Sequence, residues 1–204
     1  MAEPEGTVFF DPNRVEVIDW PAFKVDIEAE RQRPSAGKIS IHAYVSNRLR
    51  GEGHNVVVYD DGSGEVADFI AIDETARDIR FTLYHAKGSH GAEPGERVAD
   101  VYEVCGQSVK CIRWTLSAER LIKRLLDRST GREAEWVIVG TRADLSGLLT
   151  SVVQKKVSFE IVIVQPGISR ARLQPDNIAI PLASADLFIR EGGAFENLRV
   201  WGSA

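Results

Sequence analysis

The sequence has few cysteines, which limits both disulfide and metal chemistry based on sulfur. Its 204 residues include two, Cys105 and Cys111. They lie in a segment patterned as a helix, where a separation of six positions (111 minus 105) puts them on different faces. No histidine stands near them at a spacing suited to zinc. We therefore expect two buried thiols, with neither a disulfide nor a structural zinc site.

Long hydrophobic runs are also absent. The longest, around Val56–Val58 and Ile161–Val164, have the length of a strand, whereas a membrane span needs about 18 apolar residues. The first six residues, MAEPEG, are acidic and polar and lack the cationic start and apolar stretch of a secretory signal. We expect a cytoplasmic protein with no membrane partner.

The chain has no excess of basic residues. It contains 25 Lys and Arg against 30 Asp and Glu, a formal charge of −5, so its overall charge does not attract polyanions. This argues against a protein that coats DNA through bulk charge. It leaves room for a local nucleic-acid site, because the acidic metal-binding cleft of a nuclease adds negative charge. With 44% hydrophobic and 27% charged residues, the composition is that of a globular domain with one sizeable core.

Hydrophobic patterning predicts a single α/β domain whose central mixed β-sheet is flanked by helices. We divide it into an irregular N-terminal arm (1–37) with an edge strand near 15–18, a core (38–140) and a C-terminal α/β extension of the same domain (141–204). Strands 66–72 and 79–87 are joined by a short connection and should form an antiparallel hairpin. The predicted helices are 38–50, 97–113, 117–128, 145–153 and 177–190, and the other strands are 55–59, 136–139, 158–164 and 198–201.

The hairpin carries the residues most suggestive of chemistry. Side chains of a strand alternate between faces, so His85 and Lys87 should point the same way, with Asp68 beside them on the partner strand. An aspartate paired with an acid and a nearby lysine suits metal-assisted phosphodiester hydrolysis. The carboxylates hold Mg²⁺, and the lysine orients water or stabilises phosphate charge.

At these residues the sequence resembles the restriction-endonuclease-like PD-(D/E)xK nuclease superfamily. The resemblance includes the order helix, three strands, helix, strand over about 38–139, and it implies a restriction-endonuclease-like αβββαβ core. Four segments are similar to a nuclease-like C-terminal domain of some bacterial superfamily-2 helicases (60–68, DDGSGEVAD; 83–87, LYHAK; 101–107, VYEVCGQ; 163–167, IVQPG). This resemblance implies DNA as substrate, Mg²⁺ or Mn²⁺ as cofactor, and a helicase partner in DNA processing or defence against foreign DNA.

One position departs from the superfamily pattern. His85 stands two residues before Lys87, where an acid is expected, so one hard oxygen ligand is missing. Three residues can compensate: Glu65, Glu103, or Gln107, which lies one helical turn beyond Glu103. We favour Glu65 and Gln107. His85 itself can bind a softer divalent ion such as Mn²⁺ or carry a proton. The expected catalytic residues are Asp68, Lys87, His85 and Gln107, and the expected metal ligands are Asp68, Glu65 and Glu103.

Contacts to nucleic acid are expected from the loop and the helices that follow the hairpin. Ser89 and the backbone amides of the glycine-rich loop 87–91 can bind phosphate. Arg113 and Lys123 lie along predicted helical surface and can follow a nucleic-acid backbone, although an ordinary solvated helix face explains them as well. The turn 62–64 (GSG) lacks the lysine and spacing of a P-loop, so we interpret it as a tight turn that presents Glu65 and Asp68.

Two functions of different class follow. The first is a nuclease that hydrolyses DNA with a divalent ion. The second is an inactive nuclease-like fold that binds nucleic acid or docks onto a helicase, and His85 in place of the acid favours it. A chain excised from the end of a longer helicase is a third interpretation. The choice between DNA and RNA, and between endo- and exonuclease, stays open at this point.

Overall fold

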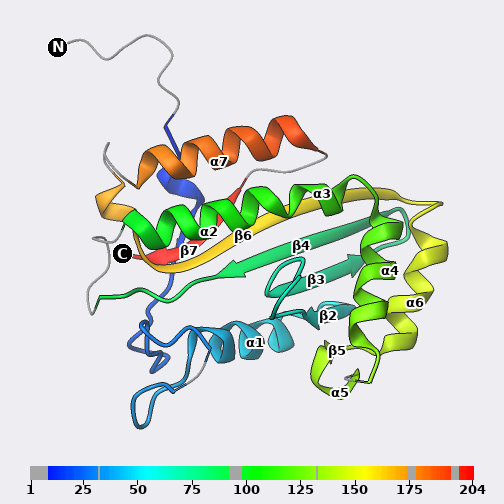
Figure 1. Ribbon diagram of the computed structural model, residues 1–204, viewed down its shortest axis with the longest axis horizontal. Helices are drawn as coiled ribbons and strands as arrows, with labels where there is room; N and C mark the ends of the chain where they lie inside the picture. The colour runs from blue at the N-terminus through cyan, green and yellow to red at the C-terminus, as the bar shows by residue number, and fades with distance from the viewer. Residues whose placement is uncertain (1–8, 32, 92–97, 132, 174–177, 194–197) are drawn as a thin grey trace.

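The computed structural model describes residues 9–31, 33–91, 98–131, 133–173, 178–193 and 198–204. They form an α/β fold around one seven-stranded sheet with the order β1-β7-β6-β4-β3-β2-β5 (Figure 1). The strands are β1 (Val15–Val17), β2 (Val56–Tyr59), β3 (Phe69–Glu74), β4 (Asp78–Ala86), β5 (Val137–Val139), β6 (Lys156–Ser169) and β7 (Arg199–Ser203). Arm, core and C-terminal extension thus all contribute strands to the same sheet.

The sheet is mixed, as predicted. β2, β3 and β4 form an antiparallel meander, and β5 pairs antiparallel with the outer edge of β2. On the other side of β4, the strands β6, β7 and β1 run parallel to one another and to β4. The hairpin expected from strands 66–72 and 79–87 is confirmed as β3–β4.

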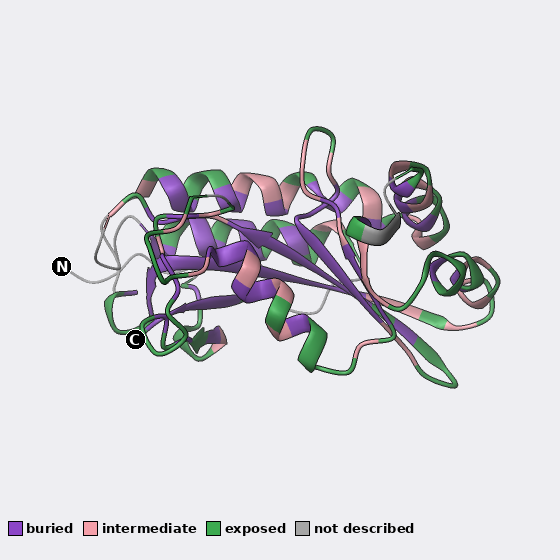
Figure 2. Ribbon diagram, turned by 90° about the horizontal axis from the view of Figure 1, so that it is seen from below, coloured by how far each residue is buried: buried purple, intermediate pink, exposed green. Residues whose placement is uncertain are grey.

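Helices cover both faces of the sheet. The helices are α1 (Ile41–Gly51), α2 (Val98–Lys110), α3 (Ile112–Thr115), α4 (Ala118–Ser129), α5 (Glu133–Trp136), α6 (Arg142–Ser151) and α7 (Ala179–Gly192), with two short 3₁₀ turns, η1 (Pro12–Arg14) and η2 (Arg170–Arg172). α1 and the arm pack on one face, and α2, α4, α6 and α7 pack on the other. Buried residues therefore fill the strands between the two layers (Figure 2).

Side-chain alternation along β4 divides the core into two clusters, as expected. Phe81 and Leu83 belong to the cluster under α2, while Tyr84 and Ala86 belong to the cluster under α1. Both cysteines are buried and free. None of the described helices has the length and apolarity needed to cross a lipid bilayer.

Element boundaries differ from the prediction by a few residues, and three of the differences have an identifiable structural cause. β3 begins at Phe69 because the Val66 N–H donates to the Asp60 carboxylate and so pairs with a side chain. β6 continues past Pro166 because the Gln165 side chain bonds the Gly167 N–H and the Gly88 carbonyl where the register shifts. The helix expected at 97–113 divides into α2 and α3, since a tighter turn at 111–114 interrupts the α-helical ladder. Residues 97 and 177, where two helices were expected to begin, lie outside the described residues.

Candidate metal centre

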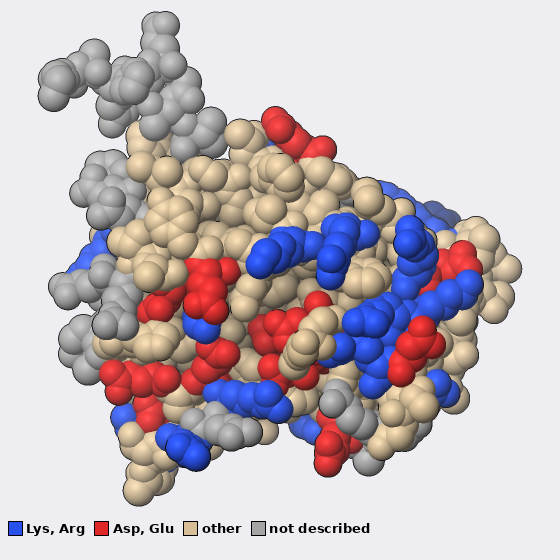
Figure 3. All heavy atoms as spheres, viewed as in Figure 1, with Lys and Arg blue, Asp and Glu red and all other residues tan. Residues whose placement is uncertain are grey.

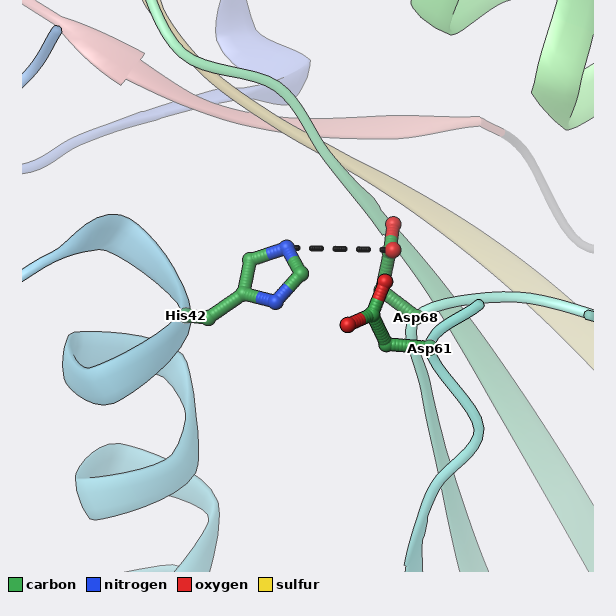
Figure 4. Close-up of side chains that lie close together, drawn as sticks. All are labelled: His42, Asp61 and Asp68. Carbon is green, nitrogen blue, oxygen red and sulfur yellow. Dashed lines mark ion pairs between the residues drawn. The ribbon is translucent and has the colours of Figure 1, made fainter. Parts of the chain in front are cut away.

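Three side chains from separate elements converge at one end of the sheet. His42 comes from α1, Asp61 from the loop after β2, and Asp68 from the residue before β3 (Figure 4). One ligand atom of each lies within 4.8 Å of the others. In the part of the chain that the structure describes, this is the one group of three such side chains close enough to hold an ion.

His42 is placed by the start of α1. Ser40 caps this helix, since its hydroxyl accepts the Ala43 N–H. The backbone N–H of His42 has no partner within the helix and donates to the Glu30 carbonyl at 2.9 Å. The imidazole then packs edge-on against the rings of Tyr59 and Phe69. This packing points the imidazole at the end of the sheet where the two aspartates lie.

The loop between β2 and β3 is held at both ends, which positions Asp61 and Asp68. Asp60 is fully buried, and its carboxylate accepts the Val66 N–H at 2.7 Å and the Arg128 Nε–H. Arg128 also donates to the Ser63 carbonyl, and the Asp60 N–H donates to the Asp68 carbonyl. The buried ion pair between Asp60 and Arg128 and the backbone hydrogen bond between Asp60 and Asp68 thus hold the two ends of the loop together.

A chain of hydrogen bonds determines which nitrogen of His42 is free. Tyr59 donates its hydroxyl proton to Asp61 at 2.9 Å, and its oxygen lies 3.1 Å from His42 Nδ1. Burial is the largest of the effects that raise the pKa of Tyr59, so the phenol stays protonated and has one proton to donate. Nδ1 must then donate to Tyr59, and a neutral ring leaves the lone pair on Nε2. Nε2 is buried without a hydrogen-bond partner and points toward Asp68.

The electrostatics of the cluster favour a positive ion. Asp68 is 5% exposed, and burial, reinforced by Glu65 and Asp61, raises its pKa well above the usual range. Its Oδ2 accepts the Ala86 N–H at 2.8 Å, but Oδ1 lies 3.7 Å from His42 Nε2, too far for a hydrogen bond. Burial lowers the pKa of His42 and keeps the ring neutral. A neutral imidazole and two carboxylates with unfilled lone pairs can bind a metal ion, which would satisfy the orphaned Nε2.

Comparisons with known proteins give no independent guide to this site. No protein-family model, curated protein or solved structure matches the chain.

Lys87 is linked to the cluster through the backbone at the end of β4. It directly follows Ala86, whose N–H binds Asp68, and its Nζ lies 2.8 Å from Glu103 and 3.2 Å from Glu30. Burial lowers the pKa of Lys87, but the two carboxylates outweigh burial, and the net shift is upward. Lys87 is therefore a cation that directly follows the residue whose N–H binds Asp68. Glu103, a predicted metal ligand, contacts Lys87 and is absent from the group of close ligand atoms.

His85, Glu65 and Gln107 meet elsewhere, in a separate cavity of about 400 Å³ between the 62–66 loop and α2–α3. His85 is 2% exposed, and neither ring nitrogen has a partner. Burial lowers its pKa to about 4, so the ring is neutral. Glu65 accepts the Gly62 N–H, and burial raises its pKa. The same cavity is also lined by Arg113, one of the predicted nucleic-acid contacts.

The other two predicted nucleic-acid contacts have local partners. Ser89 is 4% exposed and donates its hydroxyl to the Gly91 carbonyl. Lys123 is exposed on α4 and pairs with Glu119 four residues earlier. Neither residue lines the cluster or the cavity beside His85.

Sequence analysis missed His42 and Asp61. Asp61 is two residues after the end of a buried strand and seven residues before Asp68 (68 minus 61), so a second acid near Asp68 could have been predicted from the sequence. His42 had a weaker signal, namely a polar ring directly after the helix cap and the first apolar residue, Ile41. Only the packing of α1 against the end of the sheet brings His42 to the aspartates.

Proposed function

We propose that the chain is a divalent-metal-dependent phosphodiesterase that hydrolyses DNA, built on a restriction-endonuclease-like core. The observation that carries the proposal is the His42–Asp61–Asp68 cluster, with Lys87 directly after Ala86, whose N–H binds Asp68. His42 Nε2 and one oxygen of each aspartate would hold Mg²⁺ or Mn²⁺, and the imidazole favours Mn²⁺ of the two. The bound ion would supply an activated water and neutralise phosphate charge.

The roles of the chain's own groups follow from their contacts. Asp68 accepts the Ala86 N–H, which orients its other oxygen toward His42. Tyr59 holds the imidazole in the tautomer that ligation needs and restrains Asp61. Lys87, now paired with Glu30 and Glu103, is the cation that would move onto a phosphate oxygen. Each of these groups binds or orients, as phosphodiester hydrolysis requires.

The order of the elements around the cluster supports the same proposal. α1 leads into the meander β2–β3–β4, α2 follows on the opposite face, and β6 then pairs parallel with β4. From α1 to α2 the order is the helix, three strands and helix that the sequence resemblance implies. The strand expected to complete the core is β5, which follows α3, α4 and α5 and pairs with β2. Acidic side chains gather near the centre of the face in Figure 3, and basic side chains lie beside them over α3 and α4. DNA would contact the basic surface and reach the acidic centre through the ion.

The second candidate is an inactive module that binds nucleic acid or a helicase. It is favoured by the position of His85, which replaces the expected acid and lies fully buried, neutral and outside the metal cluster. The position two residues before Lys87, where the superfamily pattern has an acid, therefore supplies no carboxylate to the centre. Such a site can bind an ion and still be too weakly charged to activate water.

Cleavage assays on single-stranded DNA, double-stranded DNA and RNA, with Mn²⁺, Mg²⁺ or chelator, separate the two candidates. We expect wild-type cleavage with Mn²⁺, and a loss on the order of a hundredfold or more in both Asp68→Asn and Lys87→Met. Lys155→Met is the matched control, because Lys155 also pairs with a glutamate, Glu74, and lines neither the cluster nor the cavity beside His85. Its cleavage rate should equal that of wild type.

Calorimetry with Mn²⁺ distinguishes the roles of the two variants. Asp68→Asn should lose metal binding, whereas Lys87→Met should keep it. Equal cleavage by wild type and both variants would contradict the nuclease proposal. Mn²⁺ uptake without any cleavage, together with capture of a superfamily-2 helicase in a pull-down, would support the inactive module.

A further inference from the structure

Arg31 places a positive charge directly on the candidate metal centre. Its Nη1 lies 2.6 Å from Oδ2 of Asp61, the same oxygen that accepts the Tyr59 hydroxyl. The Arg31 side chain is 49% exposed, whereas the Asp61 side chain is 13% exposed. A solvent-facing guanidinium therefore neutralises one of the three proposed ligands while the other two lie deeper in the protein.

The backbone before Arg31 is fixed to the centre. The carbonyls of Ala29 and Glu30 accept the N–H groups of Ile41 and His42 at 2.9 Å each. The Glu30 carboxylate contacts Lys87 Nζ at 3.2 Å. The segment that carries Arg31 is thus tied both to the first turn of α1, which supplies His42, and to the proposed catalytic lysine. Its backbone is anchored, and its guanidinium pairs with Asp61 from the solvent side.

We propose that Arg31 is a substrate-binding residue of this centre, which neutralises Asp61 before the ion binds and contacts the substrate phosphate afterwards. This inference rests on the proposed function. A phosphate oxygen that shares an ion with Asp61 lies next to that carboxylate, because the ligands of one small ion are neighbours. Arg31 therefore needs only side-chain rotation to pass from a carboxylate oxygen to a phosphate oxygen, and guanidinium binds both in the same paired geometry.

The proposal requires effects of opposite sign in one variant. Without Arg31, a cation at Asp61 has no competitor, so Arg31→Ala should bind Mn²⁺ about two- to fivefold more tightly, the range expected for an exposed ion pair. The same variant should bind and cleave DNA less well, because a phosphate contact is missing. We expect cleavage to fall on the order of a hundredfold. A residue with a purely structural role would weaken both properties together.

The experiment measures three quantities on the full chain. These are Mn²⁺ affinity by calorimetry, affinity for a labelled oligonucleotide in Ca²⁺ by fluorescence anisotropy, and cleavage rate in Mn²⁺. Arg80→Ala is the matched control, since the Arg80 side chain is also 49% exposed and pairs with an aspartate, Asp73. Arg31→Lys retains the charge without the paired hydrogen bonds and should give intermediate DNA affinity. Circular dichroism checks that each variant is folded.

The outcomes separate this inference from the proposed function. Tighter Mn²⁺ binding with weaker oligonucleotide binding in Arg31→Ala, and no change in Arg80→Ala, would support the role of Arg31. Weaker Mn²⁺ binding, or unchanged oligonucleotide binding, in Arg31→Ala would overturn it. If wild type cleaves nothing, hydrolysis is refuted, while the calorimetry and anisotropy results still decide whether Arg31 passes from Asp61 to a phosphate.

Discussion

Asp68→Asn should reverse the stability order of variant and wild type between metal-free and metal-loaded conditions. In the metal-free protein, Asp68 is a buried acid close to Asp61 and Glu65 whose Oδ1 has no hydrogen bond. An asparagine keeps the acceptor for the Ala86 N–H, removes the charge, and can donate from its amide to the free lone pair of His42 Nε2. The variant should gain about 1–3 kcal/mol, the cost of a buried polar group that lacks a partner.

In the presence of Mn²⁺, wild type should become more stable than Asp68→Asn. At a concentration of free Mn²⁺ 100 times the dissociation constant, wild type gains about 2.7 kcal/mol. In a chain of 204 residues, this corresponds to a rise of about 5–11 °C in melting temperature. Asp68→Asn lacks one of the three ligands and should gain little.

The assay is thermal unfolding followed by circular dichroism, with chelator and with Mn²⁺. Asp127→Asn, which removes an exposed acid on α4, is the control and should follow wild type in both conditions. The pKa of Asp68 is raised in the folded state, so metal-free wild type loses stability as pH rises through that pKa. The advantage of the variant should therefore be small in acid and grow toward neutral pH. A variant less stable than wild type in chelator, or stabilised by Mn²⁺ as much as wild type, would refute the reasoning.

Two further predictions concern ion pairs outside the centre, one at the loop that carries Asp61 and one at the far end of β3. Arg128→Ala leaves the buried Asp60 carboxylate without its charged partner and should cost about 3–5 kcal/mol in urea unfolding. Arg124→Ala removes one bond to a loop carbonyl and should cost about 1 kcal/mol, so equal costs would contradict the importance of the buried pair. The hydrogen bond to Asp73 is the main cause that raises the pKa of His54. Its stabilising effect is therefore complete below the ordinary pKa of about 6.5 and is lost as pH rises through the folded-state pKa. The difference in unfolding free energy between wild type and His54→Gln should thus be larger at about pH 5.5 than at about pH 8.5, and a difference independent of pH would argue against this pair.

Much of the fold could be predicted because local patterning determines it. The alternation of Phe81, Leu83 and Tyr84 identified the two faces of β4, and the short connection before β4 indicated the hairpin. The errors lie where a side chain replaces a backbone partner. Asp60 takes the Val66 N–H and delays β3, and the Gln165 side chain carries β6 past a proline. Side chains that take the place of backbone partners depend on contacts between particular residues. The local alternation of polar and apolar residues does not indicate such contacts.

The candidate site was predicted only in part, for a related reason. Asp68 directly precedes β3 and Lys87 directly follows β4, so the hairpin alone brings their backbones to the same end of the sheet. His42 is 26 residues from Asp68 (68 minus 42), and its approach depends on how α1 packs on Tyr59 and Phe69. The alternation of side chains along β4 predicts the face of the sheet on which His85 lies, so His85 was expected at the same site. This alternation does not predict that the Asp68 carboxylate turns toward α1. The structure places the two side chains in different environments.

The parallel pairing of β4 with β6 has a consequence for how the chain acquires its structure. Asp78 pairs with Lys156, which lies 78 positions later in the sequence (156 minus 78). Closing a loop of that length costs about 4 kcal/mol of chain entropy beyond a constant, and contacts so distant in sequence slow folding. During synthesis, the meander β2–β3–β4 leaves the ribosome well before β6. The edge of β4 that later pairs with β6 is therefore unpaired during this time. At this edge the nascent chain would be most open to binding by chaperones or to pairing with wrong partners.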